Sequence, residues 1–216
     1  MSRKQILKLA VGFRRFHERT FLKEGSIYSR LADGQSPKTL IIGCSDSRVD
    51  PAILTAASPG EIFVVRNVAN LVPPYESAKT GFHGVSAAIE FAVVNLKVEN
   101  VVILGHRQCG GIRALMTNDH QPESFISQWM SIADDVKKSI LGKPNDGDLD
   151  NLCRSCEKES IVNSMKNLRT FPFVNQAIQE RNLLLLGIYF DLEKGELLEY
   201  DEESADFKHI DLAMTK

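Results

Sequence analysis

Four short apolar runs, each bounded by polar or turn-forming residues, stand out along the chain. They cover residues 40–42, 61–66, 100–105 and 182–190, and they are rich in Ile, Leu and Val. Continuous apolar runs of this kind are typical of strands buried on both faces, as in a parallel sheet whose strands alternate with helices. The pattern therefore predicts an α/β fold with a mostly parallel central β-sheet flanked by helices.

Helical patterns occupy the segments between the predicted strands. Asp50 followed by Pro51 indicates a helix start, because Asp caps free backbone N–H groups and Pro suits the first helical position. Apolar residues recur at helical spacing over 89–96, and residues 119–166 favour helices interrupted by the turn-rich GKPNDGD loop. No repeat or linker marks a second domain, so we expect a single domain over residues 1–216.

Composition and charge exclude some classes of partner. The chain has 216 residues, of which 43% are hydrophobic, and this suffices for one sizeable core. Its formal net charge of -2 and its pI of about 6.2 provide no basic field, so we expect no nucleic-acid partner. No run of about eighteen apolar residues occurs, and the basic amphipathic start lacks a cleavage-site pattern. We therefore expect no membrane partner and a cytoplasmic location.

Cysteine and histidine follow two of the predicted strands. Cys44 comes after the first strand, and His106 and Cys109 come after the third, within GHRQCGG. The carboxyl ends of parallel strands meet at one edge of a sheet, so these side chains can converge there although they are far apart in sequence. Two thiolates and one imidazole suit Zn²⁺, and three protein ligands leave a fourth position open, as catalytic zinc sites do.

Simpler interpretations of the same residues remain open. A cysteine at a strand end is commonly buried as a small apolar residue, and an H-x-x-C pair alone often arises by chance. Asp46 and Arg48, in CSDSRV, can likewise form a surface ion pair that contributes little. The zinc interpretation is favoured because two apolar strands each end in polar residues around a thiol, which core packing does not require.

Three motifs in this order and spacing, CSDSRV, VVRNVANLV and GHRQCGG, resemble those of the β-class carbonic anhydrases. The VVRNVANLVPPY stretch is similar to the plant-like members of that family, whose site is assembled in an open form. The resemblance implies one Zn²⁺ per chain and reversible hydration of CO2 to bicarbonate and a proton, by hydroxide that zinc provides. The residues that it implies are three metal ligands and two catalytic residues, namely Cys44, His106 and Cys109, and Asp46 and Arg48.

In the mechanism that the resemblance implies, Asp46 and Arg48 have separate tasks. Two thiolate ligands donate more charge than histidines, which makes water on the metal less acidic, so another group must hold the hydroxide in place. Asp46 can accept the hydrogen bond of the hydroxide and orient its lone pair towards carbon. Arg48 can keep Asp46 ionised and away from the metal through a bidentate pair.

The resemblance, densest over residues 25–116, also concerns assembly and the substrate pocket. It implies self-association as a dimer or tetramer, with an N-terminal helical arm (about 1–33) packing on a partner subunit. Positions that match the substrate side of the pocket, in one case across the subunit interface, are Gln35, Phe63, Val68, Phe91 and Gly110. Phe91 stands where many relatives have tyrosine and lacks that hydroxyl, and both phenylalanines suit a plain core role equally well.

Some members of the family bind bicarbonate at a non-catalytic interface site built from Trp, Arg and Tyr. Arg66 is present here, but Ile41 stands at the Trp position and Phe190 at the Tyr position. We therefore expect this chain to lack that inhibitory site, and we expect Arg66 to have a structural role.

Other cysteines and histidines have no assigned role. Cys153 and Cys156, in CRSC, could form a redox pair or half of a second zinc site, but the apolar helical spacing around them favours burial. An exposed histidine could relay a proton, and the candidates are His17, His83, His120 and His209.

Three classes of function follow from these residues. A zinc lyase that interconverts CO2 and bicarbonate is the leading hypothesis. A hydrolase of CS2 or COS on the same zinc scaffold is the alternative, since the two differ only in access to the pocket. A non-catalytic bicarbonate-binding module is disfavoured, because such a module has no need for all three metal ligands together with the Asp and Arg.

Overall fold

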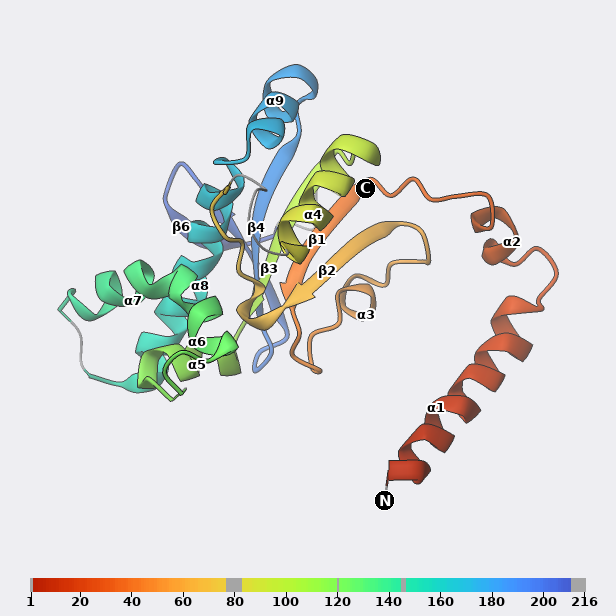
Figure 1. Cartoon of the computed structure of the whole chain (residues 1–216), viewed down its shortest axis with the longest axis horizontal. Helices are drawn as coiled ribbons and strands as arrows, with labels where there is room; N and C mark the ends of the chain where they lie inside the picture. The colour runs from red at the N-terminus through yellow and green to blue at the C-terminus, as the bar shows by residue number, and fades with distance from the viewer. Residues whose placement is uncertain (1, 77–82, 120, 145–146, 211–216) are drawn as a thin grey trace.

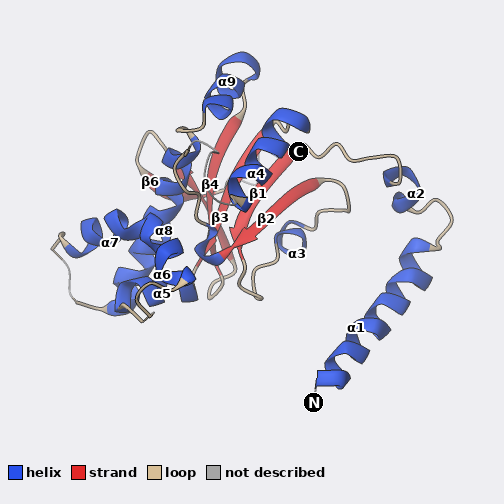
Figure 2. Ribbon diagram, viewed as in Figure 1, coloured by secondary structure: helices blue, strands red, loops and turns tan. Residues whose placement is uncertain are grey.

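A computed structural model describes residues 2–76, 83–119, 121–144 and 147–210. The strands form one six-stranded sheet in the order β2-β1-β3-β4-β5-β6 (Figure 2). Their bounds are β1 (Thr39–Cys44), β2 (Ile62–Asn67), β3 (Asn100–His106), β4 (Leu184–Asp191), β5 (Glu196–Asp201) and β6 (Asp206–His209). The first four are parallel to one another, whereas β5 is antiparallel to both β4 and β6. The prediction of a mostly parallel sheet is confirmed.

All four predicted strands are present, with small shifts at their ends. The antiparallel strands β5 and β6 were not predicted. Their sequences, ELLEYD and DFKH, mix charged and apolar residues, and their side chains are mostly half-buried or exposed. A hairpin at the edge of a sheet, with one face exposed to solvent, lacks the continuous apolar run that marks β1, β3 and β4.

Helices fill the connections between the strands, as expected for an α/β fold. They are α1 (Ser2–Phe16), α2 (Ile27–Leu31), α3 (Pro51–Thr55), α4 (Gly84–Glu90), α5 (Gly110–Thr117), α6 (Phe125–Met130), α7 (Asp134–Leu141), α8 (Leu149–Leu168) and α9 (Pro172–Arg181), with single turns of other helix types at His17–Phe21, Val68–Asn70, Phe91–Asn95 and Ser131–Ala133. The predicted cap of α3 is confirmed, because the Asp50 carboxylate accepts from the N–H groups of Ala52 and Ile53. The GKPNDGD loop separates α7 from α8, with residues 145–146 outside the described part.

One face of the sheet carries the main core, under α4, α8 and α9 (Figure 1). Helix α8 packs closely on β3 and β4 because glycines face it. A Cβ atom on Gly105 would lie 2.7 Å from Ile161 Cδ1, and one on Gly187 would lie 2.7 Å from Met165 Sδ. The close approach places the first half of α8 behind the carboxyl ends of these strands, where the predicted metal ligands lie.

The opposite face of the sheet is covered more thinly. Ile41, Val102 and Leu104 form a small buried cluster there, against Leu54 of α3. Helix α1 projects away from the sheet (Figure 1). It exposes a series of large apolar side chains, namely Ile6, Leu7, Leu9, Val11 and Phe13. None of the described helices has both the length and the apolarity needed to span a bilayer.

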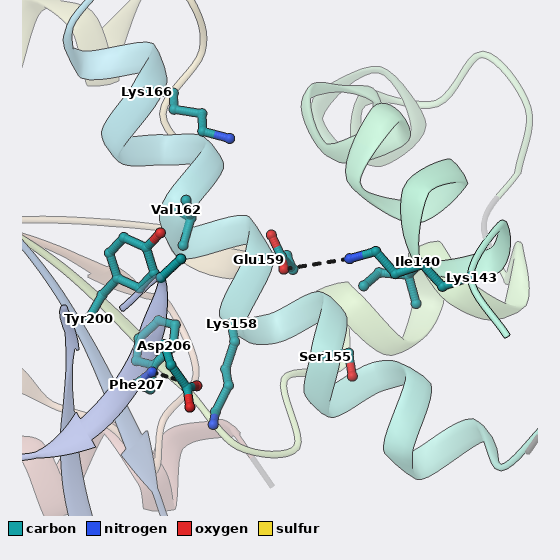
Figure 3. A pocket seen from close by; sticks show the side chains of 11 residues that line it. Ile140, Lys143, Ser155, Lys158, Glu159, Val162, Lys166, Tyr200, Asp206 and Phe207 are labelled. Carbon is teal, nitrogen blue, oxygen red and sulfur yellow. Dashed lines mark hydrogen bonds and ion pairs between the residues drawn. The ribbon is translucent and has the colours of Figure 1, made fainter. Parts of the chain in front are cut away.

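A cavity of about 340 Å³ lies between α8, α7 and the β5–β6 hairpin (Figure 3). On one side Lys143 pairs with Glu159 at 4.0 Å. On the other side the ammonium group of Lys158 lies 5.3 Å from the ring centroid of Phe207. The residues that line this cavity include none of the predicted site residues, so the cavity is separate from the predicted zinc site.

Candidate active site and metal centre

Cys44, His106 and Cys109 come together at the carboxyl edge of the parallel strands. Cys44 ends β1, His106 ends β3, and Cys109 caps α5. All three are buried, and their ligand atoms lie within 4.8 Å of one another. The two sulfur atoms are 4.0 Å apart, close to the spacing of about 3.8 Å expected for two thiolates that each lie about 2.3 Å from a tetrahedral zinc ion.

The backbone carbonyl of the next residue orients His106 as a metal ligand. His106 Nδ1 lies 2.8 Å from the carbonyl oxygen of Arg107 and must donate to it, because a carbonyl only accepts. The other nitrogen, Nε2, then carries a free lone pair, and it is buried without a hydrogen-bond partner among the described residues. A buried polar atom is normally paired, so an unpaired imidazole nitrogen beside two thiols fits a bound Zn²⁺.

The pKa values of the Cys44 and Cys109 thiols are shifted in opposite directions. The hydrogen bond from Cys109 lowers the pKa of Cys44 to about 4, against the opposing effect of burial. The same hydrogen bond, together with burial, raises the pKa of Cys109. Burial lowers the pKa of His106, but Cys44, the Arg107 carbonyl and Asp46 together raise it by more. A metal that binds both sulfurs takes them as thiolates, so its binding displaces the proton of Cys109.

Asp46 and Arg48 form a bidentate pair beside the ligand cluster. Arg48 Nε donates to Asp46 Oδ1 at 2.9 Å, and Nη2 donates to Oδ2 at 2.8 Å. The Arg48 backbone N–H also donates to Oδ1, at 2.9 Å. These bonds hold the pKa of Asp46 well below its usual range. The Asp46 N–H lies 3.4 Å from Cys44 Sγ, so the carboxylate is attached to the backbone turn that presents the first ligand.

Arg66 anchors the backbone of this turn. Its Nε donates to the carbonyl oxygen of Cys44 at 2.9 Å, and its Nη2 donates to that of Asp46 at 2.7 Å. Its Nη1 reaches Asp50 Oδ2 at 3.0 Å, which joins the turn to the start of α3. These three bonds agree with the structural role expected for Arg66.

Two of the predicted substrate-side residues lie next to the metal ligands. Gly110 follows Cys109 directly, as the first residue of α5. Val68 lies against the same helix, because a Cβ atom on Gly111 would be 2.7 Å from Val68 Cγ1. They provide an uncharged surface beside the cluster.

The other three substrate-side predictions lie elsewhere within a single chain. Gln35 is exposed in the loop that enters the amino end of β1, whereas Cys44 is at the carboxyl end. Phe63 pairs in register with Leu40, near that same amino end. Its ring lies 5.8 Å from the ring of Phe91, centroid to centroid, on the β2 side of the sheet. The chain alone does not bring these residues to the ligands.

A buried polar cluster behind Cys109 was not predicted from the sequence. Glu157 of α8 accepts from the Cys109 N–H at 3.1 Å and from the Tyr189 hydroxyl at 2.8 Å. The guanidinium of Arg107 lies 4.0 Å from Glu157 and is itself buried. Burial raises the pKa of Glu157. Helical spacing could have revealed it, because Glu157 lies four residues after Cys153 and four before Ile161, on the apolar side of the predicted helix.

The predicted burial of Cys153 and Cys156 is confirmed. Both lie in the apolar core between α8 and its neighbours, and burial raises the pKa of Cys156 to about 12. Such a thiol is inert at neutral pH. Among the histidines without a role, His17 stacks on Phe21 in the arm, and His120 lies outside the described residues.

Comparisons with known proteins agree with this geometry. A family model described as carbonic anhydrase matches residues 39–197. Beta carbonic anhydrase 3 of Arabidopsis thaliana is 36% identical over 205 residues, which are 93% of this chain and 78% of that protein. The solved structure of the β-carbonic anhydrase CcaA has a TM-score of 0.88 at 32% identity, over 96% of this chain and 92% of that one.

One of the similar structures belongs to an assembly. A structure from a study of two tetrameric β-carbonic anhydrases of Sordaria macrospora has a TM-score of 0.71 at 27% identity, over 92% of this chain and 95% of that one. The family model covers most of the chain, and it includes all three residues of the metal cluster. With its strands, its Cys-His-Cys cluster and its close relatives in agreement, the chain belongs to the β-class carbonic anhydrases.

Proposed function

We propose that this protein is a zinc enzyme that reversibly hydrates CO2 to bicarbonate and a proton. The observation that carries the proposal is the unpaired Nε2 of His106 next to two thiol sulfurs, with the Asp46–Arg48 pair beside them. Membership of the family supports both the metal and the reaction. A module that only binds bicarbonate does not require the ionised Asp46 carboxylate to be held beside the Cys-His-Cys cluster.

The side chains have distinct tasks in this reaction. Cys44, His106 and Cys109 would hold a zinc ion, which would supply hydroxide from water near neutral pH, as is established for carbonic anhydrases in general. Asp46 is ionised, so it can only accept, and it receives the hydrogen bond of the reacting water and orients that water. Arg48 holds both carboxylate oxygens of Asp46 in a bidentate pair, which fixes the plane of the carboxylate. The apolar surface by Val68 then takes the uncharged CO2.

The test is stopped-flow CO2 hydration with the zinc content measured on the same samples. We expect one zinc per chain, and we expect Cys44→Ser combined with Cys109→Ser to lose both metal and activity. Release of sulfide from CS2 or COS is assayed alongside, because the same cluster could serve those substrates. Zinc retained in the double variant, or sulfide release without CO2 hydration, would overturn the proposal.

We further propose that the protein self-associates through its N-terminal arm and the β2 side of the sheet. Tetrameric relatives support self-association in general. Leu9 on α1 is 75% exposed, and Val64, Phe91 and Val94 are exposed at or near β2. An interface at β2 would also explain Gln35, Phe63 and Phe91, which would then face the pocket of a partner subunit. The single domain over residues 1–216 and the cytoplasmic location remain proposals from the sequence.

Sedimentation velocity tests this assembly at micromolar concentration. Leu9→Asp places a charge on the apolar side of α1, and we expect it to shift the protein towards smaller species. Lys8→Gln, at the adjacent position of the same helix, lowers the net charge by the same single unit and is the matched control. A monomeric wild type, or an unaltered oligomer in Leu9→Asp, would contradict the proposed role of the arm.

A further inference from the structure

Arg48 has a second set of contacts, opposite Asp46. Its Nη2 donates to the main-chain carbonyl oxygen of Gln108 at 3.0 Å, and its Nη1 lies 3.5 Å from the Gln108 side-chain oxygen. The Arg48 side chain is 47% exposed. An ion pair between an exposed arginine and a carboxylate contributes little stability by itself, because ordering both side chains costs conformational entropy. The hydrogen bonds from the guanidinium to Gln108 restrict the Arg48 side chain further.

Gln108 is itself held in an uncommon conformation. It has a φ of 59°, in the left-handed region that side chains other than Gly and Asn rarely adopt. It lies in the turn between His106 and Cys109, and in this conformation its carbonyl accepts from Arg48. Its side-chain amide donates from Nε2 to Glu193 Oε1 at 2.5 Å. The Gln108 side chain therefore joins the metal-ligand turn to another part of the chain.

Hydrogen bonds and ion pairs restrain Glu193. It lies in the turn between β4 and β5, where the buried carboxylate of Asp191 accepts from the N–H groups of Glu193 at 3.1 Å and Lys194 at 3.3 Å. The second oxygen of Glu193 lies 3.3 Å from Arg107 and 3.6 Å from Arg154. Its backbone is thus restrained by the end of β4, and its side chain by arginines of the β3–α5 turn and of α8.

We infer that Gln108 and Glu193 are positioning residues for the hydration reaction. The Glu193 carboxylate holds the Gln108 amide, Gln108 holds the Arg48 guanidinium, and Arg48 holds Asp46 in the orientation that receives the reacting water. The turn after β4 thereby helps to orient the Asp46 carboxylate, which otherwise is oriented only by the half-exposed Arg48. This inference rests on the proposed function, since it concerns how Asp46 is aimed.

Four variants separate the hydrogen bond from charge and from backbone strain. Glu193→Ala removes the acceptor of the Gln108 amide. Glu193→Gln keeps an acceptor oxygen and removes the charge that faces Arg107 and Arg154. Gln108→Asn keeps an amide and suits the left-handed backbone, but it is too short to reach Glu193. Glu196→Ala, at the start of β5, is the control for loss of a carboxylate close to the same turn.

Two quantities are measured on each zinc-loaded variant. One is kcat/KM for CO2 hydration per bound zinc. The other is hydrogen exchange of the Arg48 Nε–H in protein labelled with ¹⁵N-arginine, where the signal is assigned by its loss in Arg48→Lys. We expect kcat/KM to fall about fivefold in Glu193→Ala and in Gln108→Asn, the effect of losing one hydrogen bond. Exchange at Arg48 should accelerate in the same two variants. Glu193→Gln should recover most of both losses, and Glu196→Ala should match wild type.

Several outcomes would overturn the inference. Wild-type kcat/KM and exchange in Glu193→Ala would show that the hydrogen bond between Glu193 and Gln108 does not position Arg48. Equal loss in Glu193→Gln and Glu193→Ala would assign the effect to the ion pairs with the two arginines. If Glu193→Ala does not fold, Gln108→Asn still tests the link from its other end, with Glu193 left in place. Arg48 exchange is measured without reference to turnover, so a wild type that does not hydrate CO2 refutes the proposed function and leaves the positioning link separately tested.

Discussion

Replacing Asp46 by Asn tests whether the carboxylate takes part in catalysis or only packs the turn. Asp46 accepts three hydrogen bonds from Arg48, two of them from the guanidinium. Asn retains one oxygen, so it loses one charge-assisted bond, and it turns an N–H₂ group towards Arg48 or towards the reacting water. Such a bond contributes about 1.5–3 kcal/mol, and each 1.36 kcal/mol corresponds to about tenfold in rate. We expect the turnover per zinc to fall by about 10², the scale of other lost electrostatic groups.

The assay is CO2 hydration over a range of pH, normalised to bound zinc. Zinc content should not change in Asp46→Asn, because the three metal ligands are intact. Asp50→Asn is the matched control, since Asp50 is a nearby carboxylate that also binds an arginine, and Asn caps helices as well as Asp does. Near-wild-type turnover in Asp46→Asn, or an equal fall in Asp50→Asn, would reduce the Asp46–Arg48 pair to a structural ion pair.

Three further changes follow from the same geometry. Arg48→Ala frees Asp46 to compete with hydroxide for the open metal position, so it should keep zinc, lose most activity near pH 7, and recover part of it as pH rises; a pH-independent loss would contradict this. Gly105→Ala should destabilise the fold by about 1–3 kcal/mol in denaturant titrations, because its Cβ would meet Ile161 Cδ1 at 2.7 Å and Cγ1 at 2.8 Å. Ile161→Ala removes both atoms, so the two losses should be less than additive in the double variant. Glu157→Ala leaves the Cys109 N–H and the Tyr189 hydroxyl without the acceptor that they share, while Arg107 keeps its ion pair with Glu193. It should destabilise the fold by about 1–3 kcal/mol and speed zinc transfer to a chelator, and wild-type transfer would refute the support role.

The metal cluster could be predicted from the sequence because it depends on one general rule. Apolar runs mark the buried parallel strands, and the residues that follow such strands meet at one edge of the sheet. Cys44 and His106 end β1 and β3, which are adjacent in the sheet, so no further knowledge of the fold was needed. The Asp46–Arg48 pair could be predicted for a different reason, because the two residues lie two positions apart in one turn.

The link from Glu193 through Gln108 to Arg48 could not be predicted, because it depends on strand register. His106 pairs with Phe190 across β3 and β4, and this pairing alone brings the turn after β4 beside Gln108. A shift of one residue in that register would turn the side chains of β4 to the other face and would move Glu193 away from the amide. The link from Glu193 to Arg48 therefore belongs to the assembled sheet, whereas the ligands belong to the ends of individual strands. It follows that a change at the β4–β5 turn can weaken catalysis while metal binding remains intact.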